Sequence, residues 1–300
     1  MLDLSVIILT KDEEIHIRRC LDNISPIAKE IFIIDSFSTD KTLEIAREYP
    51  NVHILQNKWT NYATQFNWGL ENANIKTKWV LRLDADEYLT QELISELNRK
   101  LDHLDSQYTG IVFPLRRVFL GRIIRRGMPK IKLLRMFQYG KACSEIRMMD
   151  EHIQLSEGKP IEFENEFADD NLNNLSWWTQ KHVGYAIREA VDLLDIEFDL
   201  NGTACNDSDK IISKQAKSKR MKKHKYAKQP LFWRSFVYFL YRYFFKLGFI
   251  EGKEGFLWHF LQGWWYRTLV DAKVYEIKKA CGGDRHKIRQ YLKDNYNISL

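Results

Sequence analysis

The sequence predicts an α/β protein built on a mostly parallel sheet that helices cover on both sides. Four apolar runs of strand length fall within the first hundred residues, at 4–9, 30–35, 52–55 and 79–83. Segments with helical spacing of apolar residues separate these runs, so successive strands need crossover connections and should run parallel. Because the runs are apolar on both faces, helices must cover both sides of the sheet.

Helices are expected in each interval between the strands. They cover about 13–24, the segment after 38–40, about 61–73 and the segment after Thr90. Hydroxyl or carboxylate side chains at 38–40 can accept hydrogen bonds from the first free backbone N–H groups of the helix that follows. From about residue 110 the chain becomes rich in strand-forming and basic residues, and a helical pattern returns at 175–198 and again from 230 to 300.

Composition limits the class of protein. With 45% hydrophobic and 29% charged residues, the 300-residue chain can bury a sizeable core. The four cysteines lie far apart, without the spacing of a zinc site or a disulfide framework, which favours a reducing compartment. The start of the sequence lacks the features of a secretion signal, and no run of eighteen apolar residues is free of charge. We therefore expect a cytoplasmic protein that is soluble or peripheral to a membrane.

Carboxylates gather where the predicted strands end. Glu13 follows the first strand, Asp35 ends the second, and Asp84 and Asp86 follow the fourth. Ligands of open α/β sheets bind outside the carboxyl ends of the strands. An Asp-x-Asp pair on an extended segment points both side chains to one face, where they can reach one divalent cation that takes its other ligands from phosphates and water. The competing interpretation is that these acids only cap the next helix.

Four segments in this order and spacing carry a family resemblance: LSVIILTKDEE, IFIIDSFSTDKT, NYATQFNWGLENA and WVLRLDADEYL. They resemble the N-terminal half of the family 2 glycosyltransferases with the GT-A fold, especially the bacterial enzymes that build lipopolysaccharide core and surface polysaccharides. The resemblance is strong over about 3–105 and weaker to about 280. It implies an inverting, metal-dependent hexosyltransferase that moves a sugar from a nucleotide-sugar, UDP-linked, to a growing glycan or glycolipid.

The resemblance also implies roles for individual residues. It places Thr10 and Glu13 at the nucleotide base and ribose, and Asp35 on the uracil, whose N3–H a carboxylate can accept. Asp84 would face the ribose and diphosphate, and Asp86, with Asp84 beside it, would hold Mg²⁺ or Mn²⁺. Capping of the following helix remains the alternative for Asp35.

Inverting transfer also needs a base for the proton of the acceptor hydroxyl. The segment MMDEHI offers Glu151 and its rival Asp150, near the place where the family carries an acid, and a surface acid cluster is the alternative. His152 is expected to be structural.

The expected domain organisation follows from the same resemblance. Residues 1–205 would form the GT-A catalytic domain, with a nucleotide-sugar-binding half at 1–105 and an acceptor-side half at 106–205. A basic linker would cover 206–229, and an aromatic-rich helical region would cover 230–300.

Two other functions compete. A phosphatase of the haloacid dehalogenase type also uses Asp-x-Asp after an apolar strand, but on its first strand rather than the fourth. A basic module that binds nucleic acid or a membrane would use the region from Lys210 to Ile250, which holds twelve Lys or Arg and no acid. Because its basic patch would then lie beside a sheet edge lined with acids, nucleic acid is not expected as a partner.

The segment 231–249 predicts attachment to a membrane. On a helical wheel Arg234, Arg242 and Lys246 share one arc, and Trp233 belongs to the apolar arc opposite. The other members of the apolar arc are Phe236, Val237, Leu240, Tyr243, Phe244 and Leu247. Such a helix suits the headgroup layer of an anionic leaflet at the inner face of the cytoplasmic membrane. Core packing of the apolar side is the alternative.

Overall fold

The computed structural model describes residues 1–145, 152–200, 221 and 225–300. The described chain divides into two compact units. Of the described residues, the first unit contains 1–124, 130–145 and 152–172, and the second contains 125–129, 173–200, 221 and 225–300.

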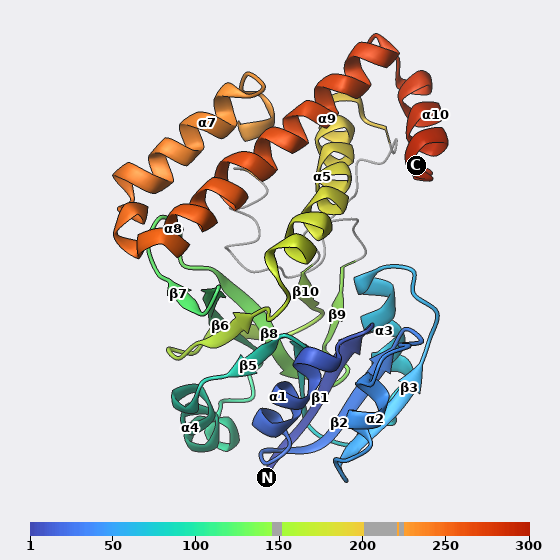
Figure 1. Ribbon diagram of the computed structural model, residues 1–300. Helices are drawn as coiled ribbons and strands as arrows, with labels where there is room; N and C mark the ends of the chain where they lie inside the picture. Colours follow the sequence, from blue (N-terminus) through green and yellow to red (C-terminus); the bar gives the residue numbers. More distant parts are fainter. Residues whose placement is uncertain (146–151, 201–220, 222–224) are drawn as a thin grey trace. The chain divides into compact units, whose positions relative to one another are not determined.

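The first unit is built around a sheet whose N-terminal part is parallel, as predicted. Its strands β1 to β4 pair in the order β3-β2-β1-β4; β1, β2 and β3 are labelled in Figure 1. Their bounds are Leu2–Thr10, Ala28–Asp35, Val52–Gln56 and Trp79–Asp84. The intervening helices are α1 (Glu14–Ile24), α2 (Thr42–Ala46) and α3 (Tyr62–Asn72), and α4 (Gln91–Lys100) follows. Asn61 and Thr90 cap α3 and α4 by accepting backbone N–H groups three residues on.

Two hydrophobic cores lie on opposite faces of this sheet. Val6 and Ile8 of β1 belong to a core with Ile17 and Leu21 of α1. Ile7, between them, belongs to a second core shared with α3. Alternate side chains of a strand point to opposite faces, so the continuous apolar runs are explained by burial on both sides.

The rest of the first unit extends the sheet with antiparallel and parallel strands. Beyond β4 the order continues β8-β6-β12-β5, with β7 and β11 also paired to β6. Strands β9 and β10 form a separate antiparallel pair. The strand bounds are Glu87–Leu89 for β5, Tyr108–Phe119 for β6, Arg122–Ile124 for β7, Lys132–Gln138 for β8, Ala142–Ser144 for β9, Ile153–Leu155 for β10, Lys159–Glu162 for β11 and Phe167–Asp170 for β12. A 3₁₀ turn, η1, covers Leu101–His103.

The second unit is helical. The 24-residue α5 (Leu175–Phe198) runs alongside α9 (Tyr266–Cys281), and their apolar faces share a core that includes Leu194 and Val270 (Figure 1). The other elements are α7 (Trp233–Leu240), η2 (Tyr241–Phe245), η3 (Gly248–Glu251), α8 (Gly252–Trp258), η4 (His259–Trp265) and α10 (Arg285–Tyr296). Helix α5 packs on α9, and the division between the two compact units falls near Leu172.

Within the described ranges, no helix is both long and apolar enough to cross a membrane.

Candidate active site at the carboxyl edge of the sheet

The strand register brings the predicted residues to one edge. Thr10 pairs with Asp35, Asp35 with Gln56, and Leu9 with Asp84. Parallel strands in this register end at the same level, so the side chains that follow them meet. The clustering of acids at this edge, expected from the sequence, is therefore a feature of the fold.

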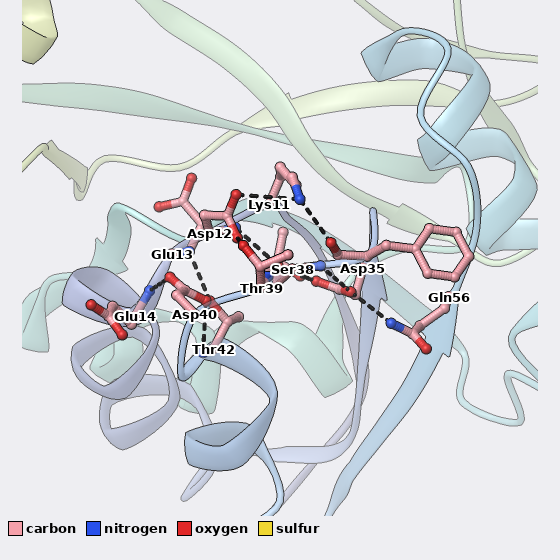
Figure 2. A network of polar contacts seen from close by, with 12 residues as sticks. Lys11, Asp12, Glu13, Glu14, Asp35, Ser38, Thr39, Asp40, Thr42 and Gln56 are labelled. Atoms are coloured by element: carbon pink, nitrogen blue, oxygen red, sulfur yellow. Dashed lines mark hydrogen bonds and ion pairs between the residues drawn. The ribbon is translucent and has the colours of Figure 1, made fainter.

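Asp35 is the centre of the hydrogen-bond network shown in Figure 2. Its Oδ1 accepts the hydroxyls of Thr10 (3.0 Å) and Ser38 (2.5 Å). Its Oδ2 accepts the backbone N–H of Ser38 (2.9 Å) and Nε2 of Gln56 (3.0 Å). The side chain is fully buried, and these four donors offset the cost of burying its charge.

The loops after β1 and β2 are joined by reciprocal hydrogen bonds (Figure 2). The backbone N–H of Asp12 donates to Ser38 Oγ, and Asp12 Oδ1 accepts the backbone N–H of Thr39. Asp12 adopts φ 54°, a left-handed conformation that Asp tolerates better than most residues. Asp40 accepts the N–H of Glu14 at the start of α1. The two loops therefore form one rigid edge.

Glu13 lies at this edge and orients a buried histidine. Its Oε2 is 2.6 Å from Nδ1 of His16, whose Nε2 accepts the backbone N–H of Leu172 (2.9 Å). Because Nε2 accepts a hydrogen bond, the proton is assigned to Nδ1, which donates to Glu13. The loop after β1 is thus tied to the segment that follows β12.

The second group of acids follows β4. The backbone N–H of Asp84 donates to Glu87 Oε2 (2.9 Å), which folds the turn between β4 and β5 back on itself. Arg135 from β8 donates through Nη2 to Glu87 Oε1 (2.5 Å) and to Asp84 Oδ2 (3.3 Å). Glu87 is buried, whereas Asp84 is partly exposed. Arg135 therefore pairs with Asp84 through Oδ2, and Nε of Arg82 on β4 lies 3.9 Å from Asp84 Oδ1.

Asp86 is positioned from two other elements. Its Oδ2 accepts Nδ2 of Asn171 (2.9 Å). Its backbone carbonyl accepts Nη2 of Arg19 (3.2 Å) and the backbone N–H of Asp170 (3.0 Å). Arg19 also forms an ion pair with Asp170 at 2.7 Å. The carboxylate of Asp86 stays partly exposed, while the hydrogen bonds to its backbone carbonyl fix the turn on which it lies.

Negative charge accumulates around this turn. Burial raises the pKa of Glu87 well above its usual range; Arg135 opposes this shift, and the charges of Asp84, Asp169 and Asp86 add to it. Burial likewise raises the pKa of Asp169, with Asp86 among the contributing charges. Burial is the largest cause of both shifts, and a divalent cation bound nearby would favour the ionised form of both carboxyl groups.

The donor set fits a divalent cation whose coordination is completed by substrate. Among the described residues, no three Asp, Glu, His or Cys side chains form a group that could hold a metal ion. Asp84 and Asp86 supply hard oxygen ligands from one turn, and Mg²⁺ is commonly bound by one or two carboxylates together with substrate phosphates and water.

Comparison with known proteins identifies the domain. Residues 5–152 match the family model described as glycosyl transferase family 2. This part of the chain is a family 2 glycosyltransferase domain. An uncharacterized glycosyltransferase of Rickettsia typhi is 25% identical over 86% of this chain and 82% of its own. A second, from Rickettsia bellii, is 36% identical over 31% of each chain.

Solved structures of glycosyltransferases are also similar. TarS 1–349 of S. aureus, in complex with UDP-GlcNAc, is 13% identical, with a TM-score of 0.45 over 94% of this chain and 92% of that one. Glucosyl-3-phosphoglycerate synthase of Mycobacterium tuberculosis, in complex with Mn²⁺ and UDP, is 18% identical, with a TM-score of 0.30 over 39% and 44% of the two chains. The predicted fold class rests on other observations and is confirmed by them: residues 5–152 match the family model, the first unit is an α/β domain, and a helical aromatic-rich region follows it.

Paired strands lie on either side of the predicted base segment. Asp150 and Glu151 themselves lie outside the described residues. On either side of them β9 and β10 are paired, and the backbone N–H of Glu145 donates to the carbonyl of His152 (2.9 Å). Asn67 of α3 fixes the end of β9 by bonding both backbone groups of Ser144. Strand β9 is thereby held against α3.

Four supporting residues of the site were not among the sequence predictions: His16, Arg19, Arg135 and Asn171. The sequence pattern around Arg135 could have indicated its role, because a lone arginine in the apolar strand KLLRMFQ needs a buried partner. The others act through contacts about 70 to 160 positions apart in the chain, such as Arg19 with Asp86 and His16 with Leu172, which no local pattern reports.

Proposed function

We propose that the enzyme transfers a sugar from a UDP-linked donor to a hydroxyl of a growing glycan or glycolipid, with inversion, in bacterial lipopolysaccharide or surface polysaccharide synthesis. The observation that carries the proposal is the partly exposed carboxylate pair, Asp84 and Asp86, at the end of β4 in a family 2 domain. It lies at the same sheet edge as the loop network around Asp35.

The reaction is a single displacement. The acceptor oxygen attacks the anomeric carbon while the bond from that carbon to the diphosphate breaks, and the electron pair leaves with the diphosphate. Glu151, with Asp150 as its rival, takes the proton of the acceptor hydroxyl. A Mg²⁺ or Mn²⁺ ion held by Asp86 and Asp84, when bound, supplies positive charge against the leaving diphosphate. Asn171 and Arg19 hold Asp86 at the end of its turn.

The nucleotide is proposed to lie over the joined loops after β1 and β2, near Thr10, Glu13 and Asp35. The carboxylate of Asp35 already accepts four hydrogen bonds, so contact with a uracil N3–H requires exchange of one donor, such as Gln56. Glu13 is partly exposed and needs no such exchange to reach a ribose hydroxyl.

The position of the acid pair argues against the phosphatase alternative. Such an enzyme needs its Asp-x-Asp at the end of its first strand, whereas here β1 ends in Thr10 and the pair follows β4. A nucleic-acid-binding module would give no reason for the carboxylates at the sheet edge.

The proposal is tested by nucleotide-dependent stabilisation and by turnover. A ligand that binds only the folded state raises the melting temperature, so UDP with Mn²⁺ should stabilise the protein more than ADP, CDP or GDP with Mn²⁺. Asp86→Asn should keep the fold and lose orders of magnitude in hydrolysis of the preferred UDP-sugar, because the leaving group loses its counter-charge. Asp102→Asn, at an exposed acid away from the site, is the matched control. Full activity in EDTA, or of Asp86→Asn, would contradict the metal assignment.

A further inference from the structure

The segment from Trp233 to Phe245 packs with its charged side inward. Arg234 and Arg242 are 6% and 1% exposed, whereas Trp233, Val237 and Phe245 are 67%, 57% and 79% exposed. Of the charged arc on the helical wheel, Arg234 and Arg242 are buried and Lys246 is exposed. Four members of the predicted apolar arc are exposed (Trp233, Val237, Phe244 and Leu247) and three are half-buried (Phe236, Leu240 and Tyr243), so core packing accounts for only part of this arc.

Buried ion pairs and hydrogen bonds fix this orientation. Arg234 Nη2 lies 2.5 Å from Asp271 Oδ1 of α9, with both side chains almost fully buried. Its Nη1 also donates to the carbonyls of Tyr226 and Ala227. Rotating the helix about its axis would leave the carboxylate of Asp271 buried without its cation. Loss of one partner from a buried ion pair is strongly destabilising, whereas loss of a solvent-exposed pair costs little.

The π-helical turn η2 carries Arg242 into the same interior. Its Nε donates to the carbonyl of Gly127 (3.2 Å), and its Nη1 donates to Gln262. Gly263 makes room for the guanidinium, since a Cβ there would lie 3.0 Å from Nη1. These contacts hold the two arginines of the segment inside the second unit. The exposed apolar side chains of the segment therefore face outward.

The outward side chains form one continuous surface, here called the aromatic face. It consists of Trp233, Val237, Tyr241, Phe244, Phe245, Leu247, Phe249, Ile250 and Phe256. The ring of Tyr243 lies 5.2 to 6.3 Å from those of Phe244, Phe249 and Phe256, so η2, η3 and α8 contribute to a single patch. Patches of this kind on a folded protein mark a binding surface.

Positive charge borders the aromatic face. Lys246 and Lys253 are exposed, as are Arg125 and Arg126. The backbone N–H of Gly127 donates to the carbonyl of Lys246, which brings the loop at 125–129 beside η2. The nearby Glu251 is buried and accepts the N–H groups of Arg125 and Arg126, so its carboxylate is directed at the backbone rather than at the rim.

We propose that the aromatic face lies in the headgroup layer of an anionic lipid bilayer. Aromatic side chains with a rim of Lys and Arg match the apolar and anionic layers of such an interface. A symmetric dimer through this face is disfavoured, because an isologous contact would bring two cationic rims together. The proposal goes beyond sugar transfer, and it would place the enzyme on the surface that carries a lipid-linked acceptor.

Vesicle flotation of the full chain tests the proposal. Wild-type protein should float with vesicles of phosphatidylcholine and phosphatidylglycerol at low salt, and float far less with phosphatidylcholine alone. The double variant Trp233→Ser, Phe245→Ser should bind the mixed vesicles about tenfold or more weakly, because two large apolar side chains no longer leave water. Leu120→Ser, at an exposed leucine of the first unit, is the control and should bind as the wild type.

Two charge-reversal variants distinguish the local effect of the cationic rim on vesicle binding from the effect of the protein's net charge. Lys246→Glu should weaken vesicle binding several-fold, whereas Lys293→Glu, at an exposed lysine of α10, should not. Circular dichroism and UDP-dependent stabilisation, measured on each variant, show that fold and nucleotide site are intact. Equal flotation of the wild type and the double variant would overturn the proposal. So would absence of wild-type flotation together with a dimer that Phe245→Ser converts to monomer, since the face would then join two copies.

Discussion

The contact of Arg135 with Glu87 provides a quantitative test of the site's electrostatics. Glu87 is 4% exposed and its Oε1 lies 2.5 Å from Arg135 Nη2. Replacing Arg135 with Met keeps most of the side-chain volume and removes the charge. Breaking a buried pair from one side costs about 3–5 kcal/mol, because the remaining charge is left unpaired. Coulomb's law at an effective dielectric constant of 20 gives about 4 kcal/mol at 4 Å, in the same range.

The loss should depend on pH in a defined direction. Burial already raises the pKa of Glu87, and Arg135 is the main influence that lowers it, so Arg135→Met should raise it further. A carboxyl group whose pKa is higher in the folded state binds more protons there than in the unfolded chain. The free energy of unfolding then falls as pH rises from the unfolded value towards the folded one. The variant should therefore lose least stability near pH 4 and most above the raised pKa of Glu87.

Urea unfolding of the wild type and variant across this pH range measures the effect. Adding Glu87→Gln to Arg135→Met should recover much of the loss at neutral pH, because no buried charge remains. Arg18→Met is the matched control, since Arg18 pairs with Glu48 on the surface and its loss should change little. A pH-independent loss that Glu87→Gln fails to relieve would show that Arg135 acts through packing, against the electrostatic account.

Three further predictions concern other residues. Glu151→Gln should abolish transfer while UDP binding persists, with a loss of about 10²–10⁴-fold; an active Glu151→Gln beside a dead Asp150→Asn would exchange their roles. Asp35→Ala should lower the urea midpoint as well as UDP affinity, since four donors lose their acceptor; an unchanged midpoint would refute this. Burial lowers the pKa of His259 to about 4, so the unfolded chain binds a proton that the folded one does not between about pH 6.5 and 4. Stability should therefore fall by about 3 kcal/mol as pH falls through this window, and a His259→Gln variant that shows the same fall would contradict it.

The parallel core of the fold was predictable because its signals are local. The apolar runs that became β1 to β4 are interrupted by helical patterns and by capping residues such as Asn61 and Thr90. The register that aligns Thr10 with Asp35 follows once these strands are buried on both faces, because a slip of one residue would move each side chain to the other face.

The mixed part of the sheet and the supports of the site depend on distant contacts. Strand β12 pairs with β5 and β6, which are about 80 and 50 positions earlier in the chain, and no periodic pattern fixes such partners. The same holds for Asn171, an unremarkable polar residue after a short strand until it meets Asp86. For α5, the helical pattern was predictable, but its partner was not, because an apolar helix face fits any complementary core.

Helix α1 explains how one sheet edge can hold two kinds of site. His16 and Arg19 are three residues apart and therefore lie on the same face of the helix. His16 joins Glu13, on the nucleotide side, to the backbone of Leu172. Arg19 joins Asp170 to the carbonyl of Asp86, on the acid-pair side. One rigid helix thus sets the spacing between the two groups. If the nucleoside lies over the joined loops and the diphosphate at the acid pair, as proposed, the donor needs that spacing fixed before binding, since ordering both loops during the reaction would reduce the binding energy available for the transition state.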